Sequence, residues 1–458
     1  MKSYRKLAAA LLAVFAAVLA GPVAAQESLT VWWVKGFYKS EDDALFAAIK
    51  KFEDKTGIKV ELSQYPVQDM IPKTVSALDA GTAPDVAFAD VYDFQVTGKW
   101  AFDGKLEDLS DILLPMKGSF LPNTLETTYL LNSKTGKRAY FAFPLKQQTM
   151  HIQYWIDMLQ TAGFKESDIP TGWHDYWSFW CDKVQPAYRK KTGTRVYATG
   201  FPMGVDSSDS FFSFLTFMDA YNVKLVDDNG RLLVDDPKVK QGLAAALKDY
   251  VEPYVKGCTP PSSTSWKDPD NNVAFHNKTT IMTHNATISI AAKWLDDANN
   301  ETLSAEQRAQ ARKNYGELIA TAGFPSKPDG TKMTYRAAVK TGVVFAGARN
   351  IKRAKEFVTF FLREENLTPY VEGALGRWYP VTRAAAERSF WKEDRHRLAV
   401  WTQFHAGTNT FEFTRNYKFT IVNNENVWAK AMNRVVNEHW AVDKAVDEMI
   451  ARIKAIAG

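Results

Sequence analysis

Strand-like and helix-like stretches alternate in the part of the chain that follows residue 28. Residues 29–34 (LTVWWV), 58–62 (IKVEL) and 84–89 (PDVAFA) have the apolar or alternating pattern of strands. Residues 44–52 have an apolar stripe at helical spacing, residues 69–80 predict a second helix, and Gly57 and Gly81 suit their ends. This order of elements is typical of a parallel sheet with helices on both faces. We therefore predict an α/β fold.

Polar and aromatic side chains follow each of these three predicted strands. In open α/β sheets, ligands bind beyond the carboxyl ends of the strands. The candidate ligand-binding residues at these ends are Lys35, Tyr38, Gln64, Tyr65, Asp90, Tyr92 and Asp93. One alternative stays open for Asp90, which could instead cap the helix that follows.

The first 25 residues have the features of a signal peptide. A basic start precedes an apolar run at residues 7–20, and the small residues Val23 and Ala25 suit cleavage after Ala25. The run is shorter than the roughly 20 residues that a membrane span needs. We expect an exported, periplasmic protein.

Charge and length limit the partners and the domain count. Removal of Lys2, Arg5 and Lys6 with the signal peptide lowers the formal net charge from +5 to +2, which favours neither nucleic acid nor a membrane surface as partner. About 430 residues then remain, more than one hydrophobic core normally covers, so two lobes are expected.

The chain has only two cysteines, Cys181 and Cys258, and no CxxC pair. This spacing is not that of a metal or redox site, and we expect no cofactor. Export permits a disulfide between the two cysteines, but the sequence leaves open whether their side chains meet.

Several motifs, in this order, resemble the extracellular solute-binding proteins of bacterial ABC importers, in the sugar-binding group that is similar to maltose-binding protein. They are LTVWW, FAAIKKFEDKTGIKVEL, ALDAGTAPDVAFAD, GKLEDLSD, FAFPL, IQYWIDMLQTAGF, PTGWHDYWSF, VAFHNKTTIMTHNATISIAAKW, AKEFVTFFL and GALGRWYPV. The chain departs from the family pattern at Trp155, Gly172 and His284-Asn285. The last two departures leave the identity of the ligand in doubt but not the fold.

The resemblance implies a type II periplasmic-binding-protein fold, with two α/β lobes that close on a ligand by a hinge. The expected boundaries are a signal peptide at 1–25, a first lobe at 26–144 and 331–365, and a second lobe at 145–330 and 366–458. The resemblance also implies a monomer that delivers a sugar, oligosaccharide or polyol to a membrane permease.

A sugar site needs aromatic rings for the faces of the sugar and polar side chains for its hydroxyls. Further candidates are therefore Gln147 at the first crossover, Asp206, Trp266, His284, Asn285 and Trp294 in the second lobe, and Arg377, Trp378, Tyr379 and Tyr417 near the C-terminus. Gln148 lies at the same crossover as Gln147, and Asp209 lies on the same second-lobe loop as Asp206, where both could equally cap a helix or form a turn.

The loop GRWYPV, residues 376–381, places three of the candidates side by side. We interpret it as a lip of the second lobe, in which Trp378 and Tyr379 stack on the ligand and Arg377 binds hydroxyls or a negative group. The alternative is that Trp378 fills the core of a lobe while Arg377 pairs with a carboxylate.

Two other functions remain as alternatives. A binding protein of this fold could take a charged solute such as a glycerol phosphate, a sugar acid or a polyamine. A secreted glycosidase would need paired carboxylates, for which Asp90 and Asp93 are candidates. The chain carries no GxSxG, HExxH or Walker A motif, so we predict that it is not an enzyme.

Overall fold

The predicted order of strands and helices opens the first lobe. It consists of β1 (Ser28–Val34), α2 (Lys39–Thr56), β2 (Lys59–Tyr65), α3 (Val67–Ala80) and β3 (Val86–Phe88). Both helices end at a glycine in the left-handed conformation, with φ of 72° at Gly57 and 69° at Gly81. β1 pairs in parallel with β2 and β3, as the alternation predicted.

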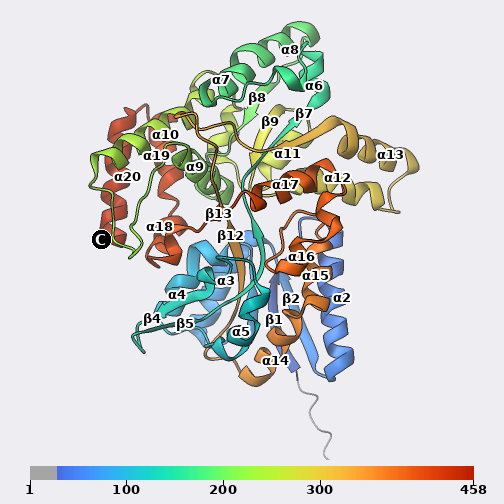
Figure 1. Cartoon of the computed structure of the whole chain (residues 1–458), viewed down its shortest axis with the longest axis vertical. Coiled ribbons are helices and arrows are strands. Elements are labelled where there is room, and N and C mark those ends of the chain that lie inside the picture. The colour runs from blue at the N-terminus through green and yellow to red at the C-terminus, as the bar shows by residue number, and fades with distance from the viewer. Residues whose placement is uncertain (1–27) are drawn as a thin grey trace, which may run out of the picture.

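Our description covers residues 28–458 of a computed structural model of the chain (Figure 1). The expected signal peptide and its cleavage site lie outside these residues. Among the helices of residues 28–458, none is both long enough and apolar enough to cross a membrane.

The first lobe, the lower half of Figure 1, is built on a five-stranded sheet in the order β2-β1-β3-β12-β6. β12 (Ala338–Val344) returns from the second lobe and runs antiparallel to β3 and to β6 (Phe143–Gln148). The same lobe contains α4 (Gly98–Phe102), α5 (Ser110–Met116), β4 (Tyr129–Asn132), β5 (Lys137–Tyr140) and α14 (Ile351–Phe361).

The second lobe, the upper half of Figure 1, is built on a four-stranded sheet in the order β10-β7-β9-β8. Its strands are β7 (His151–Trp155), β8 (Tyr197–Gly200), β9 (Thr280–Asn285) and β10 (Ile319–Ala322). Its helices include α6 (Ile156–Thr161), α7 (Trp173–Ser178), α8 (Gln185–Thr192), α9 (Ser208–Ala220), α10 (Pro237–Val255), α11 (Asp270–His276), α12 (Ser289–Asn299) and α13 (Ala305–Lys313).

The lobes are joined by several crossing segments. β6 leads into β7 through only two residues, Thr149 and Met150. The return passes through β11 (Tyr335–Arg336), which pairs with β13 (Thr408–Asn409) from the C-terminal part of the chain. Few residues therefore carry the motion of one lobe against the other, as a hinge requires.

The C-terminal part does not follow the expected boundary at residue 366. α15 (Glu364–Glu372) packs on α2, and Trp33 of β1 donates a hydrogen bond to Tyr370 (3.1 Å). α16 (Arg383–Ala386) packs on α15, so residues 366–386 belong to the first lobe. Their apolar faces complete its core, which a pattern read along the chain cannot show.

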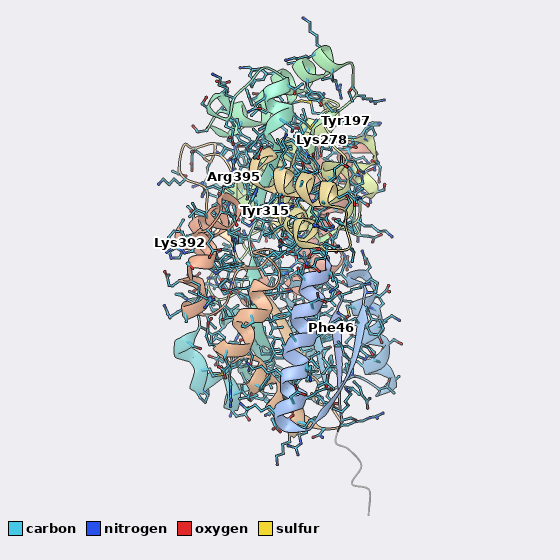
Figure 2. The ribbon with its side chains drawn as sticks, turned by 90° about the vertical axis from the view of Figure 1, so that its right-hand side faces the viewer. Phe46, Tyr197, Lys278, Tyr315, Lys392 and Arg395 are labelled. Atoms are coloured by element: carbon cyan, nitrogen blue, oxygen red, sulfur yellow. A yellow bond between two sulfur atoms is a disulfide. The ribbon has the colours of Figure 1, made fainter. Side chains whose placement is uncertain are left out.

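The chain then passes back to the second lobe. α17 (Arg395–His405) packs on β10. Figure 2 shows Arg395 above Lys392 along the long axis, where this passage occurs. α19 (Val427–Val436) and α20 (Val442–Ala457) pack on α10 of the second lobe, while α18 (Phe419–Asn424) contacts the π-helical turn at residues 93–97 of the first. The last helices therefore lie beside both lobes.

Cys181 and Cys258 are joined by a disulfide in the second lobe, with Cα atoms 5.5 Å apart. The bond closes a loop with a sequence separation of 77. Replacing both cysteines by serine is expected to lower the free energy of unfolding by about 2–4 kcal/mol, because the unfolded chain regains the entropy of that loop. Urea unfolding measures this, and the unmutated protein under reducing conditions is the control. A loss below about 1 kcal/mol would contradict this account.

Candidate functional site

A small pocket lies between the two lobes, at the carboxyl ends of the first-lobe strands. Phe37, Asp90, Gln148, Arg377 and Trp378 line it from the first lobe. Ser208, Asp209, Asp268, Asn272, Asn285, Thr287 and Ser289 line it from the second. The pocket encloses about 40 Å³. Ligand sites typically measure roughly 300–1,000 Å³, so the lobes are closed here and a sugar enters only after they open.

The loop GRWYPV forms part of the first-lobe wall, not a lip of the second lobe. Arg377 donates to both carboxylate oxygens of Glu41 at 2.8 Å, and Glu41 belongs to α2. Gly376 allows this path because its φ is 89°, and a Cβ there would lie 2.6 Å from Arg397.

The aromatic residues of this loop are packed, in contrast to the exposed stacking surface that the sequence suggested. Trp378 is 1% exposed, and its indole donates to Glu41 (3.4 Å). The ring of Tyr379 stacks on Phe404 at 4.1 Å, away from the pocket. Trp378 thus borders the pocket while being part of the core, which combines the two alternatives considered for it.

Two cations and two carboxylates form a buried network behind this wall. The amine of Lys146 lies 3.3 Å from Asp90 and 4.1 Å from the centre of the Trp378 ring. Arg377 also lies 3.6 Å from Asp90. Burial lowers the pKa of Lys146. Burial by itself would also lower the pKa of Arg377, but the carboxylates of Glu41 and Asp90 outweigh it and raise that pKa.

The second-lobe wall is built around the start of α9. Asp268 accepts hydrogen bonds from the backbone amides of Ser208 (2.5 Å) and Asp209 (3.2 Å) and from the hydroxyl of Ser207 (3.0 Å). A carboxylate is favoured here because the helix N-terminus carries unpaired amides and a partial positive charge. Asp268 is therefore the capping group of α9.

Asp209 lies beside this cap and is 7% exposed. One of its oxygens accepts from the amide of Asn271 (3.0 Å). Burial raises the pKa of Asp209 well above its ordinary value, and repulsion from Asp268 raises it further. Asn285 donates to Asn272 (3.1 Å) and Ser289 (2.7 Å), which holds the neighbouring amides in place.

Gln147 and Gln148 show why adjacent residues on a strand have different roles. Side chains alternate between the two faces of a strand. Gln147 donates to the carbonyl of Pro380 (2.7 Å) and supports the GRWYPV loop. Gln148 lines the pocket instead and is 6% exposed, and its side chain has no hydrogen-bond partner among residues 28–458.

Of the 17 ligand-binding candidates, four line the pocket: Asp90, Asn285, Arg377 and Trp378. Gln148 and Asp209, which the sequence analysis named beside them, line it as well. Other first-lobe candidates have structural contacts. Tyr38 donates to the carbonyl of Ala374 (2.6 Å), Gln64 to Asp42 (2.7 Å), Tyr65 packs on Trp32, Tyr92 bonds Thr74 (2.5 Å), and Asp93 pairs with Lys340 (3.2 Å). Lys35 is exposed at the end of β1.

The remaining second-lobe and C-terminal candidates also lie outside the pocket. Asp206 is exposed, Trp266 donates to Ser262 (3.1 Å), Trp294 packs edge-on against Trp155, and Tyr417 stacks on Phe102 at 4.0 Å. His284 is enclosed by the rings of Trp177, Phe201 and Phe217, and burial lowers its pKa to about 3. It is therefore a neutral core residue.

Several pocket residues were missed because their sequence signal is that of a helix start. Asp268 and Asn272 belong to the polar stretch KDPDNN, and Ser208 belongs to DSSDS. Such stretches occur before most helices. These residues are distinguished only because the starts of α9, α11 and α12 meet at one place, and the tertiary structure alone shows this.

A larger groove of about 1260 Å³ lies elsewhere on the surface. It runs between the β4–β5 hairpin, with Tyr129 and Arg138, and the second-lobe loop at residues 228–229. The side chain of Arg138 spans it to the carbonyls of Thr414 and Arg415. None of the 17 ligand-binding candidates from the sequence lines this groove.

Comparisons with known proteins agree with this architecture. The model of the family described as bacterial extracellular solute-binding protein matches residues 47–399. The arabinooligosaccharide-binding protein of Bacillus subtilis (strain 168) is 27% identical over 230 residues, which are 49% of this chain and 48% of that protein. The chain thus matches about half the length of this relative.

Two solved structures match over nearly the whole chain. A solute-binding protein of an ABC transporter from Thermotoga lettingae TMO, bound with alpha-D-tagatose, has a TM-score of 0.75 at 19% identity, covering 94% of this chain and 100% of that one. A sugar transporter structure from Arthrobacter chlorophenolicus A6 with bound laminaribiose has a TM-score of 0.73 at 14% identity, with coverage of 94% and 100%. At these identities the likeness establishes the two-lobed fold.

Proposed function

Because the chain belongs to the bacterial extracellular solute-binding protein family, we propose that it captures a carbohydrate between its lobes and delivers it to the permease of an ABC importer. The observation that carries the proposal is the interlobe pocket, where amides, carboxylates, hydroxyls and one guanidinium converge beside Trp378. Such groups satisfy sugar hydroxyls, and charge-assisted hydrogen bonds are the stronger ones. The similar proteins described above, which bind arabinooligosaccharides, alpha-D-tagatose and laminaribiose, support the same class.

We also propose that the protein is exported to the periplasm, that it is a monomer and that it is not an enzyme. A glycosidase would need two carboxylates facing one ligand. Asp90 lines the pocket, but Asp93 pairs with Lys340 outside it. The geometry therefore does not favour that pair as catalytic residues.

Thermal unfolding of residues 26–458 in the presence of mono-, di- and oligosaccharides tests the capture of a carbohydrate. A ligand that binds only the folded state raises the melting temperature by mass action. Replacing Gln148 by alanine is expected to weaken binding of the saccharide about tenfold, since one hydrogen bond is lost. Stability without ligand should change little, because the side chain of Gln148 forms no hydrogen bond within residues 28–458 and the alanine keeps the backbone pairing with Ala338.

Tyr129→Ala is the matched control, because Tyr129 is 43% exposed in the larger groove. Its affinity for the saccharide should equal that of the unmutated protein. If Tyr129→Ala lowers the affinity and Gln148→Ala does not, the ligand binds in the groove and the assignment of the pocket is wrong. If no saccharide raises the melting temperature, the carbohydrate proposal fails.

A further inference from the structure

The charges on the first-lobe wall of the pocket compensate one another. Arg377 is paired with Glu41 at 2.8 Å, and Asp90 lies 3.3 Å from Lys146. These four groups contribute two positive and two negative charges. A ligand that approaches this wall therefore meets hydrogen-bonding groups whose charges are already balanced.

The second-lobe wall carries two carboxylates without a basic partner. Among residues 28–458, no lysine, arginine or histidine forms an ion pair with Asp209 or Asp268. Asp268 is satisfied by the start of α9 and by two serine hydroxyls. The Oδ2 atom of Asp209 accepts from Asn271, whereas its Oδ1 atom accepts from no described residue. Asp209 thus forms no direct ion pair within the described residues, and Arg377 and Lys340 offset its charge only in part, since its pKa is still raised.

Gln148 is a second observation, independent of the carboxylates, that points to a polar ligand in this pocket. The residue is 6% exposed, it lines the pocket, and its side chain has no hydrogen-bond partner among the described residues. Buried amides are normally hydrogen-bonded, and an unpaired one costs about 1–3 kcal/mol. Gln148 comes from the first lobe and Asp209 from the second, so one ligand between the closed lobes can satisfy both.

We propose that the captured saccharide carries a protonated amine, which binds the Oδ1 atom of Asp209. This inference rests on the proposed function. Burial and repulsion from Asp268 disfavour the ionised form of Asp209 and raise its pKa, and a neutral hydroxyl supplies no positive charge that would stabilise the carboxylate. An ammonium group supplies both the donor and the opposite charge. The carbonyl oxygen of Gln148 is available to accept from a neighbouring group of the same sugar.

Isothermal titration at pH 6.5 with matched sugars tests the inference, because an amine with a pKa of about 8 is protonated there. The probes are glucosamine, galactosamine and deacetylated chitobiose. Each is compared with its N-acetyl form and with the hydroxyl form, which is glucose, galactose or cellobiose. Spermidine is included as an amine without a sugar. At least one amino sugar is expected to bind at least tenfold tighter than both of its neutral counterparts.

Asp209→Asn is expected to remove at least tenfold of the affinity for that amino sugar. Asp206→Asn is the matched control, because Asp206 is exposed on the same segment and lies outside the pocket. It should leave the affinity unchanged. If Asp209→Asn does not fold, as judged by its thermal transition, the comparison of amino and neutral sugars on the unmutated protein decides the question by itself.

Tighter binding of a neutral sugar than of its amino counterpart would overturn the inference and leave the proposed function standing. Absence of binding by every amino sugar would also overturn it, and the neutral sugars would then decide the proposed function separately. Binding of spermidine with no saccharide bound would overturn both.

Discussion

Replacing Arg377 by methionine is expected to abolish detectable saccharide binding and to lower the free energy of unfolding by about 3–5 kcal/mol. The guanidinium lines the pocket and is also the partner of Glu41, whose side chain is 8% exposed. Its removal would leave the carboxylate of Glu41 buried and unpaired, and Asp90 would lose a second neighbouring cation. Urea unfolding and calorimetric titration with the saccharide measure the two effects.

The two effects can be separated with a double variant. Arg377→Met combined with Glu41→Gln removes both charges of the pair, so much of the lost stability should return. Binding should not return, because the pocket still lacks its guanidinium. If Arg377→Met retains full stability, the ion pair of Arg377 and Glu41 does not stabilise the fold. If the double variant binds the saccharide normally, Arg377 does not contact the ligand.

Replacing Arg336 by methionine is expected to lower the free energy of unfolding by a similar amount, about 3–5 kcal/mol. Arg336 belongs to β11, between the lobes, and its guanidinium binds Asp219 of α9 (2.8 Å) and Glu412 (2.5 Å). All three side chains are nearly buried. Burial raises the pKa of Asp219 even though Arg336 opposes the shift, and removal of Arg336 would take an ion-pair partner from both carboxylates.

Arg415→Met is the control for Arg336, because it removes an arginine of the same size from a neighbouring, solvent-exposed position. Arg415 lies 3.7 Å from Asp228, whose side chain is 97% exposed, and such surface pairs contribute at most about 1 kcal/mol. Urea unfolding of both variants is the measurement. If both variants lose the same free energy of unfolding, the buried ion pairs of Arg336 do not stabilise the protein more than a surface pair does.

Local patterns of the sequence predicted the first five elements of the first lobe. The spacing of apolar residues and the glycines at 57 and 81 led to β1, α2, β2, α3 and β3, because these patterns depend on neighbouring residues only. The assignment of residues 366–386 to the second lobe was wrong for the opposite reason. Tyr370 and Trp378 meet Trp33 and Lys146, which lie more than 200 positions away along the chain.

The candidate site was predicted only in part. Asp90, Asn285, Arg377 and Trp378 line the pocket, whereas Tyr92, His284 and Tyr379 are packed in the core. An aromatic or polar residue at a strand end has the same sequence signal in both situations. One position along the strand decides the outcome, as Gln147 and Gln148 show, because neighbouring side chains point to opposite faces.

The sequence by itself determined the α/β class, the alternation of strands and helices and the resemblance to solute-binding proteins, since these rest on short-range periodicity and on motif order. Only the tertiary structure decided which charges compensate one another. Arg377 meets Glu41 across 336 positions, whereas Asp209 forms no ion pair with any of the residues 28–458. Burial and charge balance are properties of that three-dimensional meeting, and they decide what the pocket can bind.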